Sequence, residues 1–331
     1  MRVDLVAQDD KDARPLLIVD SMNLFIRSWA AYPTMSTHGY QMGGCMGFLK
    51  TLSRIVNEIQ PRAVYVVWEG GGSQRRRKLY SEYKLGRKAQ KLNRFYGDDI
   101  PDSEENKKHQ LITLLSMLKC APVCQVYVSD CEGDDIVAHL CRGPFRNEEK
   151  IIVSSDKDMY QLLDEKTKIY SLHKKRVVTG EEISDEFRID PQNFAIAKAL
   201  CGDPGDNVPG VKGLGFKTAA TKFPFLGGKT PVILQEVLDF CRTHSDESII
   251  YRRILEHEDD LKRNWQLVYL DGSMLSADQV SRVQHTLDTF TPQANRIGLI
   301  KALVKEGIDG FDTEGFFYAF NCVDGFKSVK N

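Results

Sequence analysis

Short apolar runs alternate with amphipathic segments along the first half of the chain. The apolar runs occupy residues 16–20, 63–69, 123–128 and 150–156. Between them, residues 43–59 and 106–118 carry hydrophobic side chains at helical spacing. This alternation predicts an α/β fold, in which a mostly parallel central sheet is flanked by helices.

Three of the apolar runs end in an acidic residue, at Asp20, Glu69 and Asp156. In open α/β sheets, ligands bind beyond the carboxyl ends of the strands. A single acid in such a place is consistent with a loop residue or a helix cap. Three acids at the same edge of one sheet predict a functional site.

The strand pattern fades after Ile189, and the remainder is predicted to be mainly helical. A helix at 191–200 begins with Pro191, which suits the first turn of a helix. The aromatic sequence at 315–322, GFFYAFNC, is consistent with a packed helix or a partner-binding tail, and packing is favoured. No internal repeat or long low-complexity tract is present.

These patterns divide the chain into an α/β core at 14–190 and a mainly helical region at 191–331. The polar, irregular stretch at 87–103 predicts an insertion in the core that leads into the helix at 106–118. The whole insertion, taken as 84–118, is expected to be helical.

Composition narrows the class of protein without deciding it. The 331 residues are 42% hydrophobic and 27% charged, as in an ordinary globular protein. No apolar run approaches the roughly 20 residues that cross a membrane, and the acidic N-terminus does not resemble a secretory signal. The eight cysteines show no C-x-x-C pair, which favours reduced thiols. We therefore expect a soluble, cytoplasmic monomer without membrane contact.

The charge is unevenly distributed. The net charge is −1, but the stretch from Arg75 to Lys91 carries eight basic residues against one acid, Glu82. A near-neutral total can hide a basic binding surface beside an acidic site.

Acidic residues recur in four short groups. The groups contain Asp20; Glu132, Asp134 and Asp135; Asp156 and Asp158; and Asp203 and Asp206. Mg²⁺ and Mn²⁺ prefer oxygen ligands, so a site for two such ions needs several convergent carboxylates. Two metal ions suit phosphodiester hydrolysis, because one activates water while both stabilise charge on the phosphate.

The acids also have a simpler explanation. Glu132, Asp134 and Asp135 directly precede an apolar helical pattern, where acids cap free N–H groups and interact favourably with the helix dipole. Capping does not explain four acids among the six positions from Asp130 to Asp135. Each group alone is a weak signal, whereas all four in this order are a strong one.

Five segments together resemble the flap endonuclease/5′–3′ exonuclease family, which includes the nuclease part of bacterial DNA polymerase I and stand-alone bacteriophage enzymes. The segments are LLIVDSMNL, LYSEYKLGR, CEGDDIVAHL, VSSDKDMYQLL and GDPGDNVPGVKGLGFKTAATKF. The resemblance covers about residues 16–225 and implies a PIN-like nuclease core with a helical gateway. No polymerase follows, so the stand-alone, phage-type enzyme is the closer comparison.

The resemblance implies roles for particular residues. Metal binding is implied for Asp20, Glu132, Asp134 and Asp135 at a first site and for Asp156, Asp158, Asp203 and Asp206 at a second. The family usually has Asp where this chain has Glu69, whose longer side chain could still reach a metal through water. Lys84 and Arg87 match residues that contact the scissile phosphate, and Tyr83 matches an aromatic on which a terminal base stacks. Lys84 and Arg87, three apart, are also consistent with a solvated helix face.

The glycine-rich segment at 202–225 predicts a turn that opens a helix near Phe216. Glycines allow close approach to a phosphate, and a helix N-terminus directs free N–H groups toward it. The residues expected to contact DNA in this segment are Gly210, Lys212, Gly213, Gly215, Lys217 and Thr218; those in the basic stretch are Arg75, Arg76, Arg77 and Lys88. The segment is not a nucleotide P-loop, because Phe216 separates Gly215 from Lys217. The resemblance implies a helix–turn–helix-like hairpin that grips duplex DNA and holds K⁺.

We therefore expect a 5′-nuclease that uses two Mg²⁺ ions, replaceable by Mn²⁺. Its substrates would be branched or nicked DNA with a single-stranded 5′ end, and RNA–DNA primers. Two alternatives remain open at this point: a catalytically impaired DNA-binding protein of the same fold, and a PIN-type ribonuclease. A calcium-binding module is excluded because no EF-hand loop pattern is present.

Overall fold

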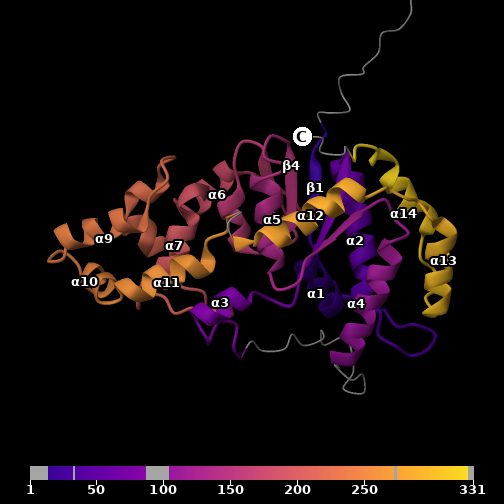
Figure 1. Ribbon diagram of the computed structural model, residues 1–331, viewed down its shortest axis with the longest axis horizontal. Coiled ribbons are helices and arrows are strands. Elements are labelled where there is room, and N and C mark those ends of the chain that lie inside the picture. The colour runs from indigo at the N-terminus through magenta and orange to yellow at the C-terminus, as the bar shows by residue number, and fades with distance from the viewer. Residues whose placement is uncertain (1–13, 33, 87–103, 272–273, 327–331) are drawn as a thin grey trace, which may run out of the picture.

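The computed structural model describes residues 14–32, 34–86, 104–271 and 274–326. A six-stranded sheet lies at the centre of the molecule, with helices on both faces and a helical extension at one end (Figure 1). The strands are β1 (Leu16–Asp20), β2 (Ala63–Trp68), β3 (Cys124–Tyr127), β4 (Lys150–Ser154), β5 (Thr167–Ser171) and β6 (Arg176–Val178). The predicted α/β class is confirmed.

The four apolar runs of the sequence form β1 to β4. The strand order is β3-β2-β1-β4-β5-β6, and only β6 runs antiparallel to its neighbour. Strands β1, β2 and β4 are almost wholly buried, which explains why they are continuous apolar runs without alternation. Strands β5 and β6 were not predicted, because they are short and contain polar or charged residues.

The helices are α1 (Ser21–Ala31), α2 (Gly43–Ile59), α3 (Gln74–Leu79), α4 (Glu104–Leu118), α5 (Gly133–Arg142), α6 (Gly180–Phe187), α7 (Phe194–Cys201), α8 (Phe216–Lys222), α9 (Leu234–Thr243), α10 (Ile249–Glu256), α11 (Glu258–Val268), α12 (Ala277–Thr289), α13 (Arg296–Lys305) and α14 (Thr313–Ala319). Short 3₁₀ turns are η1 (Lys157–Leu162), η2 (Pro191–Asn193), η3 (Pro204–Asp206), η4 (Pro224–Gly227) and η6 (Phe320–Cys322). The helix predicted at 191–200 therefore begins as a 3₁₀ turn. Its first proline lacks an N–H donor and is tolerated there.

Two hydrophobic clusters cover the two faces of the sheet. One joins β1 to α5 and to the helices of the extension, and includes Ile18, Ile136 and Leu200. The other joins β1 to α1, α2 and α4, and includes Val19 and Phe48. Alternate residues of β1 point into different clusters, as the pleat of a strand requires.

The C-terminal helices do not belong to the extension. Helices α13 and α14 lie beside α2 and α4 at the opposite end of the molecule, and α12 crosses between the two ends (Figure 1). Phe316, Phe317 and Phe320 are buried in the same cluster as α2, so the preference for packing of residues 315–322 is confirmed. The boundary placed after residue 190 stays a prediction, because later helices contribute to both clusters.

The structure also shows the state of the cysteines and the lengths of the apolar helices. All eight cysteines are free thiols. Within the described part of the chain, no helix is long and apolar enough to span a bilayer.

Candidate active site

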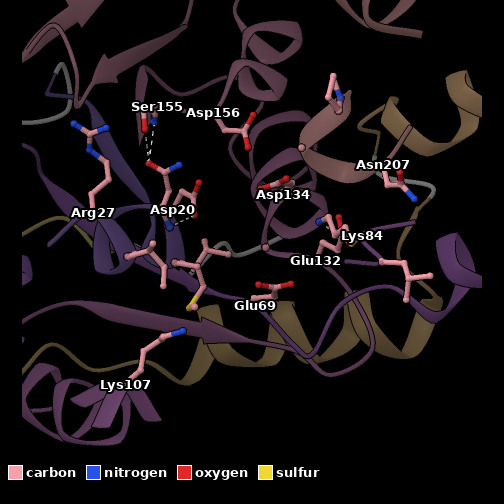
Figure 2. Close-up of a pocket in the computed structure, with 18 of the residues that line it drawn as sticks. Asp20, Arg27, Glu69, Lys84, Lys107, Glu132, Asp134, Ser155, Asp156 and Asn207 are labelled. Carbon is pink, nitrogen blue, oxygen red and sulfur yellow. Dashed lines mark hydrogen bonds and ion pairs between the residues drawn. The ribbon is translucent and has the colours of Figure 1, made fainter. Parts of the chain in front are cut away.

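A cleft opens at the carboxyl ends of β1, β2 and β4 and has a volume of about 940 Å³. It lies where the chain leaves the central strand β1 and the order of strands reverses, the usual ligand position in such sheets. The lining includes the acids Asp20, Glu69, Glu132, Asp134 and Asp156, together with Lys84. Figure 2 shows these side chains around the cavity, with Arg27 and Lys107 on the side opposite Lys84.

Asp20 follows the central strand and also caps a helix. Its carboxylate accepts from the backbone N–H of Asn23 at 3.1 Å, at the start of α1, and from the Ser154 hydroxyl at 2.8 Å. Burial outweighs these hydrogen bonds and, with the nearby charges of Asp156 and Glu69, raises the pKa of Asp20 to about 6. Capping and membership of the site are therefore compatible roles for one carboxylate.

Asp134 lies in the first turn of α5, at the centre of the cleft (Figure 2). Burial raises its pKa well above the ordinary value, and the neighbouring charges of Asp156 and Asp20 add to the shift. Burial likewise raises the pKa of Asp156. Among the described residues, no ion pair joins Asp20, Asp134 or Asp156 to a cation. The centre of the cleft thus holds more negative charge than the neighbouring side chains neutralise.

Glu132, by contrast, has cationic and hydroxyl partners. The Lys84 ammonium lies 2.8 Å from Glu132 Oε1 and 3.7 Å from Asp206 Oδ2. The Tyr83 hydroxyl donates to Glu132 Oε2 at 3.1 Å and to Asp206 Oδ2 at 3.2 Å. Burial opposes the ionised form, but Lys84 and Arg76 outweigh it, so the pKa of Glu132 lies below its ordinary value.

The side chain of Tyr83 differs from the expectation that it presents a stacking surface. Tyr83 is 6% exposed and packs in a cluster with Ala199, Val208 and Leu267. Its ring is therefore held in the interior, and its hydroxyl joins two acids of the site. Lys84 also differs, because residues 81–86 form turns and Lys84 has φ +57°, so it does not lie on a helix face.

Lys198 of α7 is a charged residue of the site that the sequence analysis missed. It is 5% exposed, and its ammonium pairs with Asp158 and, at 2.8 Å, with Asp203. Burial opposes ionisation of Asp203, but Lys198 outweighs it and lowers the pKa of that carboxyl. A lysine within an apolar helix is rarely buried without a partner. That mismatch in FAIAKALC was the available signal.

Asp135 and Arg76 occupy positions that differ from their expected roles. The Arg76 guanidinium is 1% exposed and binds both carboxylate oxygens of Asp135, at 2.6 and 2.7 Å. Arg76 is therefore withdrawn from any DNA surface. The Asp135 carboxylate faces this guanidinium and also accepts from the backbone N–H of Glu132 at 3.3 Å. The capping explanation applies to Asp135 more than to its neighbours.

The remaining basic residues lie at the surface or outside the described residues. Arg75 and Arg77 are exposed on α3. Arg87 and Lys88 lie outside the residues that the structure describes, as does the whole stretch 87–103 of the expected insertion at 84–118. Of that insertion, the turn at 84–86 and α4 are described.

The glycine-rich turn projects from the end of α7 and opens α8 at Phe216, as expected. The backbone turns back so closely that a Cβ on Gly210 would lie 1.9 Å from the Cys201 carbonyl oxygen, and Gly202 has φ +75°. Gly210, Lys212, Gly213, Gly215 and Lys217 are exposed, and Thr218 is half-buried. The turn starts at Asp203 and Asp206, so one short segment joins the acidic cleft to an exposed glycine-rich surface.

The chemistry of the donor set fits a hard divalent cation. The side chains at the centre of the cleft offer carboxylate oxygens, and Asp20, Asp134 and Asp156 form no ion pair with a described cation. Within the described ranges, no three acidic, histidine or cysteine side chains already stand at metal-ligand spacing. Lys84 and Lys198 instead pair with Glu132 and Asp203.

Comparison with known proteins agrees with this architecture. Residues 15–188 match the sequence model of the family described as 5′-3′ exonuclease, N-terminal resolvase-like domain. The chain is 30% identical over 208 residues to a 5′-3′ exonuclease of Aquifex aeolicus, covering 62% of this chain and 68% of that protein. It is 30% identical over 255 residues to the thermostable DNA polymerase I of Thermus aquaticus, covering 76% of this chain and 28% of that protein.

Among solved structures, the flap endonuclease of bacteriophage T5 in complex with DNA and metal ions matches with a TM-score of 0.60. The match has 19% sequence identity and covers 88% of this chain and 98% of that one. It supports the same sheet-and-helix fold. The family model covers more than half of the sequence, including β1 with Asp20 and the segments after β2 and β4 that carry Glu69 and Asp156. This chain therefore belongs to the 5′-3′ exonuclease family.

Proposed function

We propose that the protein is a structure-specific 5′-nuclease that hydrolyses phosphodiester bonds at 5′ ends, flaps and nicks of DNA. The observation that carries this proposal is the acid-lined cleft at the carboxyl ends of β1, β2 and β4. In it Lys84 pairs with Glu132, while Asp20, Asp134 and Asp156 form no ion pair with a described cation. The 5′-3′ exonuclease family and the flap endonuclease fold support it.

When bound, two divalent cations would supply positive charge and lower the pKa of a water that attacks the phosphate. Asp20, Asp134 and Asp156 would hold them, with Glu69 and Glu132 acting directly or through water. Asp158, Asp203 and Asp206 would complete the second position. Mg²⁺ is the proposed ion, with Mn²⁺ as a substitute, and the T5 structure described with metal ions supports a metal requirement.

The protein's own cations would act on the substrate. The Lys84 ammonium is held beside Glu132 and Asp206, where it would contact a phosphate bound at these acids. Burial opposes its charged form, but the charges of Glu132, Asp206 and Asp134 outweigh it and raise the pKa of Lys84, which keeps it protonated at neutral pH. A fixed cation there would stabilise charge that grows on the phosphate in the transition state. Arg87 is proposed for the same task.

Duplex DNA would lie against the glycine-rich turn. The exposed backbone around Gly213 and Gly215, with Lys212 and Lys217, would contact phosphates without reading the bases. A K⁺ ion held by carbonyl oxygens of this turn remains part of the proposal. The 5′ strand would pass the basic stretch that begins at Arg75, and RNA–DNA primers would be handled in the same way.

The experiment is cleavage of a 5′-end-labelled flap, with Mg²⁺, Mn²⁺, Ca²⁺ and chelator compared, beside an Asp134→Ala control. Short labelled products near the junction with Mg²⁺, absent with chelator and in the variant, would support the proposal. Tight binding of the flap without cutting under any metal would instead favour the catalytically impaired DNA-binding protein. Cleavage of single-stranded RNA, with no preference for the DNA flap, would favour the PIN-type ribonuclease.

A further inference from the structure

Helix α11 contacts both the duplex-binding turn and the acidic site. Asn264, in its middle, is fully buried. The Asn264 amide donates to the carbonyl oxygen of Ala199 at 3.2 Å and to that of Pro209 at 2.7 Å. Ala199 belongs to α7, and Pro209 lies at the base of the glycine-rich turn. One buried side chain of α11 therefore ties α7 to the start of the glycine-rich turn.

One helical turn further along, α11 is fastened to the acidic site. The carbonyl oxygen of Leu267 accepts a hydrogen bond from Arg76 Nε at 2.8 Å. The other end of the same guanidinium binds Asp135 through two hydrogen bonds and lies 3.4 Å from Glu132 Oε2. Arg76 thus joins the backbone of α11 to the start of α5, which carries Glu132 and Asp134.

The chain that follows α11 is held by a second set of directed bonds. The Gln161 amide donates to the Val268 carbonyl at 3.0 Å and accepts from the Leu270 N–H at 2.8 Å. Arg142 of α5 donates to the Leu270 carbonyl at 2.6 Å. The end of α11 is consequently anchored to α5 and η1, the two elements that follow acidic residues of the cleft.

The bonds of Asn264 to the glycine-rich turn and of Leu267 to Arg76 lie close together on α11, so a shift of the helix would move both. Asn264 and Leu267 are three residues apart, which is a rise of about 4.5 Å along a helix. A bidentate, planar guanidinium contact tolerates little sliding, and a buried amide with two acceptors tolerates little more. Hydrophobic residues would fill the same volume at a lower desolvation cost than the buried Arg76–Asp135 ion pair. We therefore assign these directional contacts a role in aligning α11 with the site.

We propose that α11 sets the distance and orientation between the duplex-binding turn and the catalytic acids, with Arg76 and Asn264 as positioning residues. In this arrangement Asp135 is the counter-ion that orients Arg76 and does not bind metal. The inference rests on the proposed nuclease function and deepens it. It assigns a role in the reaction to α11, which lies after the last of the five family-like segments.

The first test compares Arg76→Lys with the intact protein. Lysine keeps the charge but cannot bind Asp135 and the Leu267 carbonyl as a rigid fork. Ca²⁺ binding by calorimetry, without DNA, is expected to weaken about 10- to 100-fold, the usual loss when a group that orients a metal ligand is removed. If Asp135 were itself a metal ligand, freeing it from Arg76 would leave Ca²⁺ affinity unchanged or tighter. Either of those results would overturn the inference.

Single-turnover cleavage at saturating DNA supplies the second readout. Arg76→Lys is expected to cut about 10- to 100-fold more slowly, with the Kd for flap DNA in Ca²⁺ unchanged. Asn264→Ala is expected to spread the products over neighbouring positions, because the turn is no longer registered against the acids. Arg282→Lys is the matched control, since Arg282 forms an exposed pair with Asp278 on α12; it should behave as the intact protein in every assay.

The double variant tests whether the two residues act through one element. If α11 links them, the combined rate loss stays close to the larger single loss; independent roles would multiply the two losses. Melting temperatures establish that each variant is folded at the assay temperature.

If Arg76→Lys does not fold, Arg76→Met with Asp135→Leu removes both charges and provides the same test. A folded double variant with intact Ca²⁺ affinity and intact cutting would overturn the inference. Absence of cutting by the intact protein would count against the proposed nuclease function. The Ca²⁺ titration would still test the positioning role of Arg76, because it does not depend on cleavage.

Discussion

Replacement of Lys84 by methionine is the substitution that most directly tests the proposed chemistry. Methionine keeps much of the length of the side chain and removes the ammonium that lies 2.8 Å from Glu132 Oε1 and 3.7 Å from Asp206 Oδ2. We expect cleavage to slow much more than DNA binding weakens. The reason is that the cation's strongest role arises when negative charge grows on the phosphate, which happens after binding.

The magnitude follows from the position of the ammonium. Two unit charges about 4 Å apart interact by about 4 kcal/mol at an effective dielectric constant of about 20. Loss of one preorganised group of this kind typically slows catalysis about 10²- to 10³-fold, which is about 2.7–4 kcal/mol. Loss of one phosphate contact, with a salt slope of about 0.9, weakens binding about eightfold at about 0.1 M salt. The rate should therefore fall at least tenfold more than the affinity.

The assay is single-turnover cleavage of a labelled 5′ flap, with the Kd measured separately in Ca²⁺. Lys84→Arg should retain part of the rate because the charge remains. Lys262→Met is the matched control: Lys262 forms an exposed pair with Glu258 far along the chain, so its removal should change neither quantity. A normal single-turnover rate for Lys84→Met, or a loss confined to Kd, would refute the role assigned to Lys84.

Three further outcomes are expected. Asp134→Asn should abolish detectable cleavage and weaken Ca²⁺ binding in calorimetry at least tenfold, and retained binding would exclude Asp134 from the metal site. The melting temperature of the metal-free protein should fall as pH rises from about 4 to about 6. The pKa of Asp20 is raised from 3.8 to about 6, so the folded state keeps that proton up to a higher pH than the unfolded chain does. Added Mg²⁺ should remove the trend, and a rise in melting temperature over this pH range would contradict the pKa assigned to Asp20. Gly210→Ala should destabilise the protein by about 1–3 kcal/mol in denaturant unfolding and weaken duplex binding, since the added Cβ would meet the Cys201 carbonyl. Gly215→Ala has open space around the added Cβ and serves as the control for stability, so equal losses of stability in the two variants would refute the steric argument.

Hydrophobic patterning and motif order determined the fold class and the place of the site. Continuous apolar runs form strands because both faces of this sheet are covered, and acids at their carboxyl ends meet because parallel strands share one edge. Asp20 and Asp156 were predictable on these grounds. Strand β5 was missed because its position next to β4 is a tertiary property, which compensates for its polar residues.

The direction in which a side chain points was decided only by the tertiary structure. Asp134 and Asp135 are adjacent in sequence and chemically identical, yet one faces the cleft and the other faces Arg76. Consecutive residues of a helix point about 100° apart, so neighbours in a motif cannot share one environment. Arg76 likewise sits in a run of three arginines, and only the packing of α3 on α11 buries the middle one.

Long-range pairing explains the remaining differences. Lys198 stands out locally as a lysine in an apolar helix, but the local pattern does not reveal that its ammonium pairs with Asp158, forty residues earlier in the chain, as well as with Asp203. Tyr83 carries the aromatic ring that the motif required, but Val208 and Leu267 enclose that ring from distant parts of the chain. The sequence by itself determined which chemical groups are present and which edge of the sheet gathers them. The tertiary structure decided which carboxylates keep an uncompensated charge, because neutralisation depends on distances of a few ångströms between residues far apart in the chain.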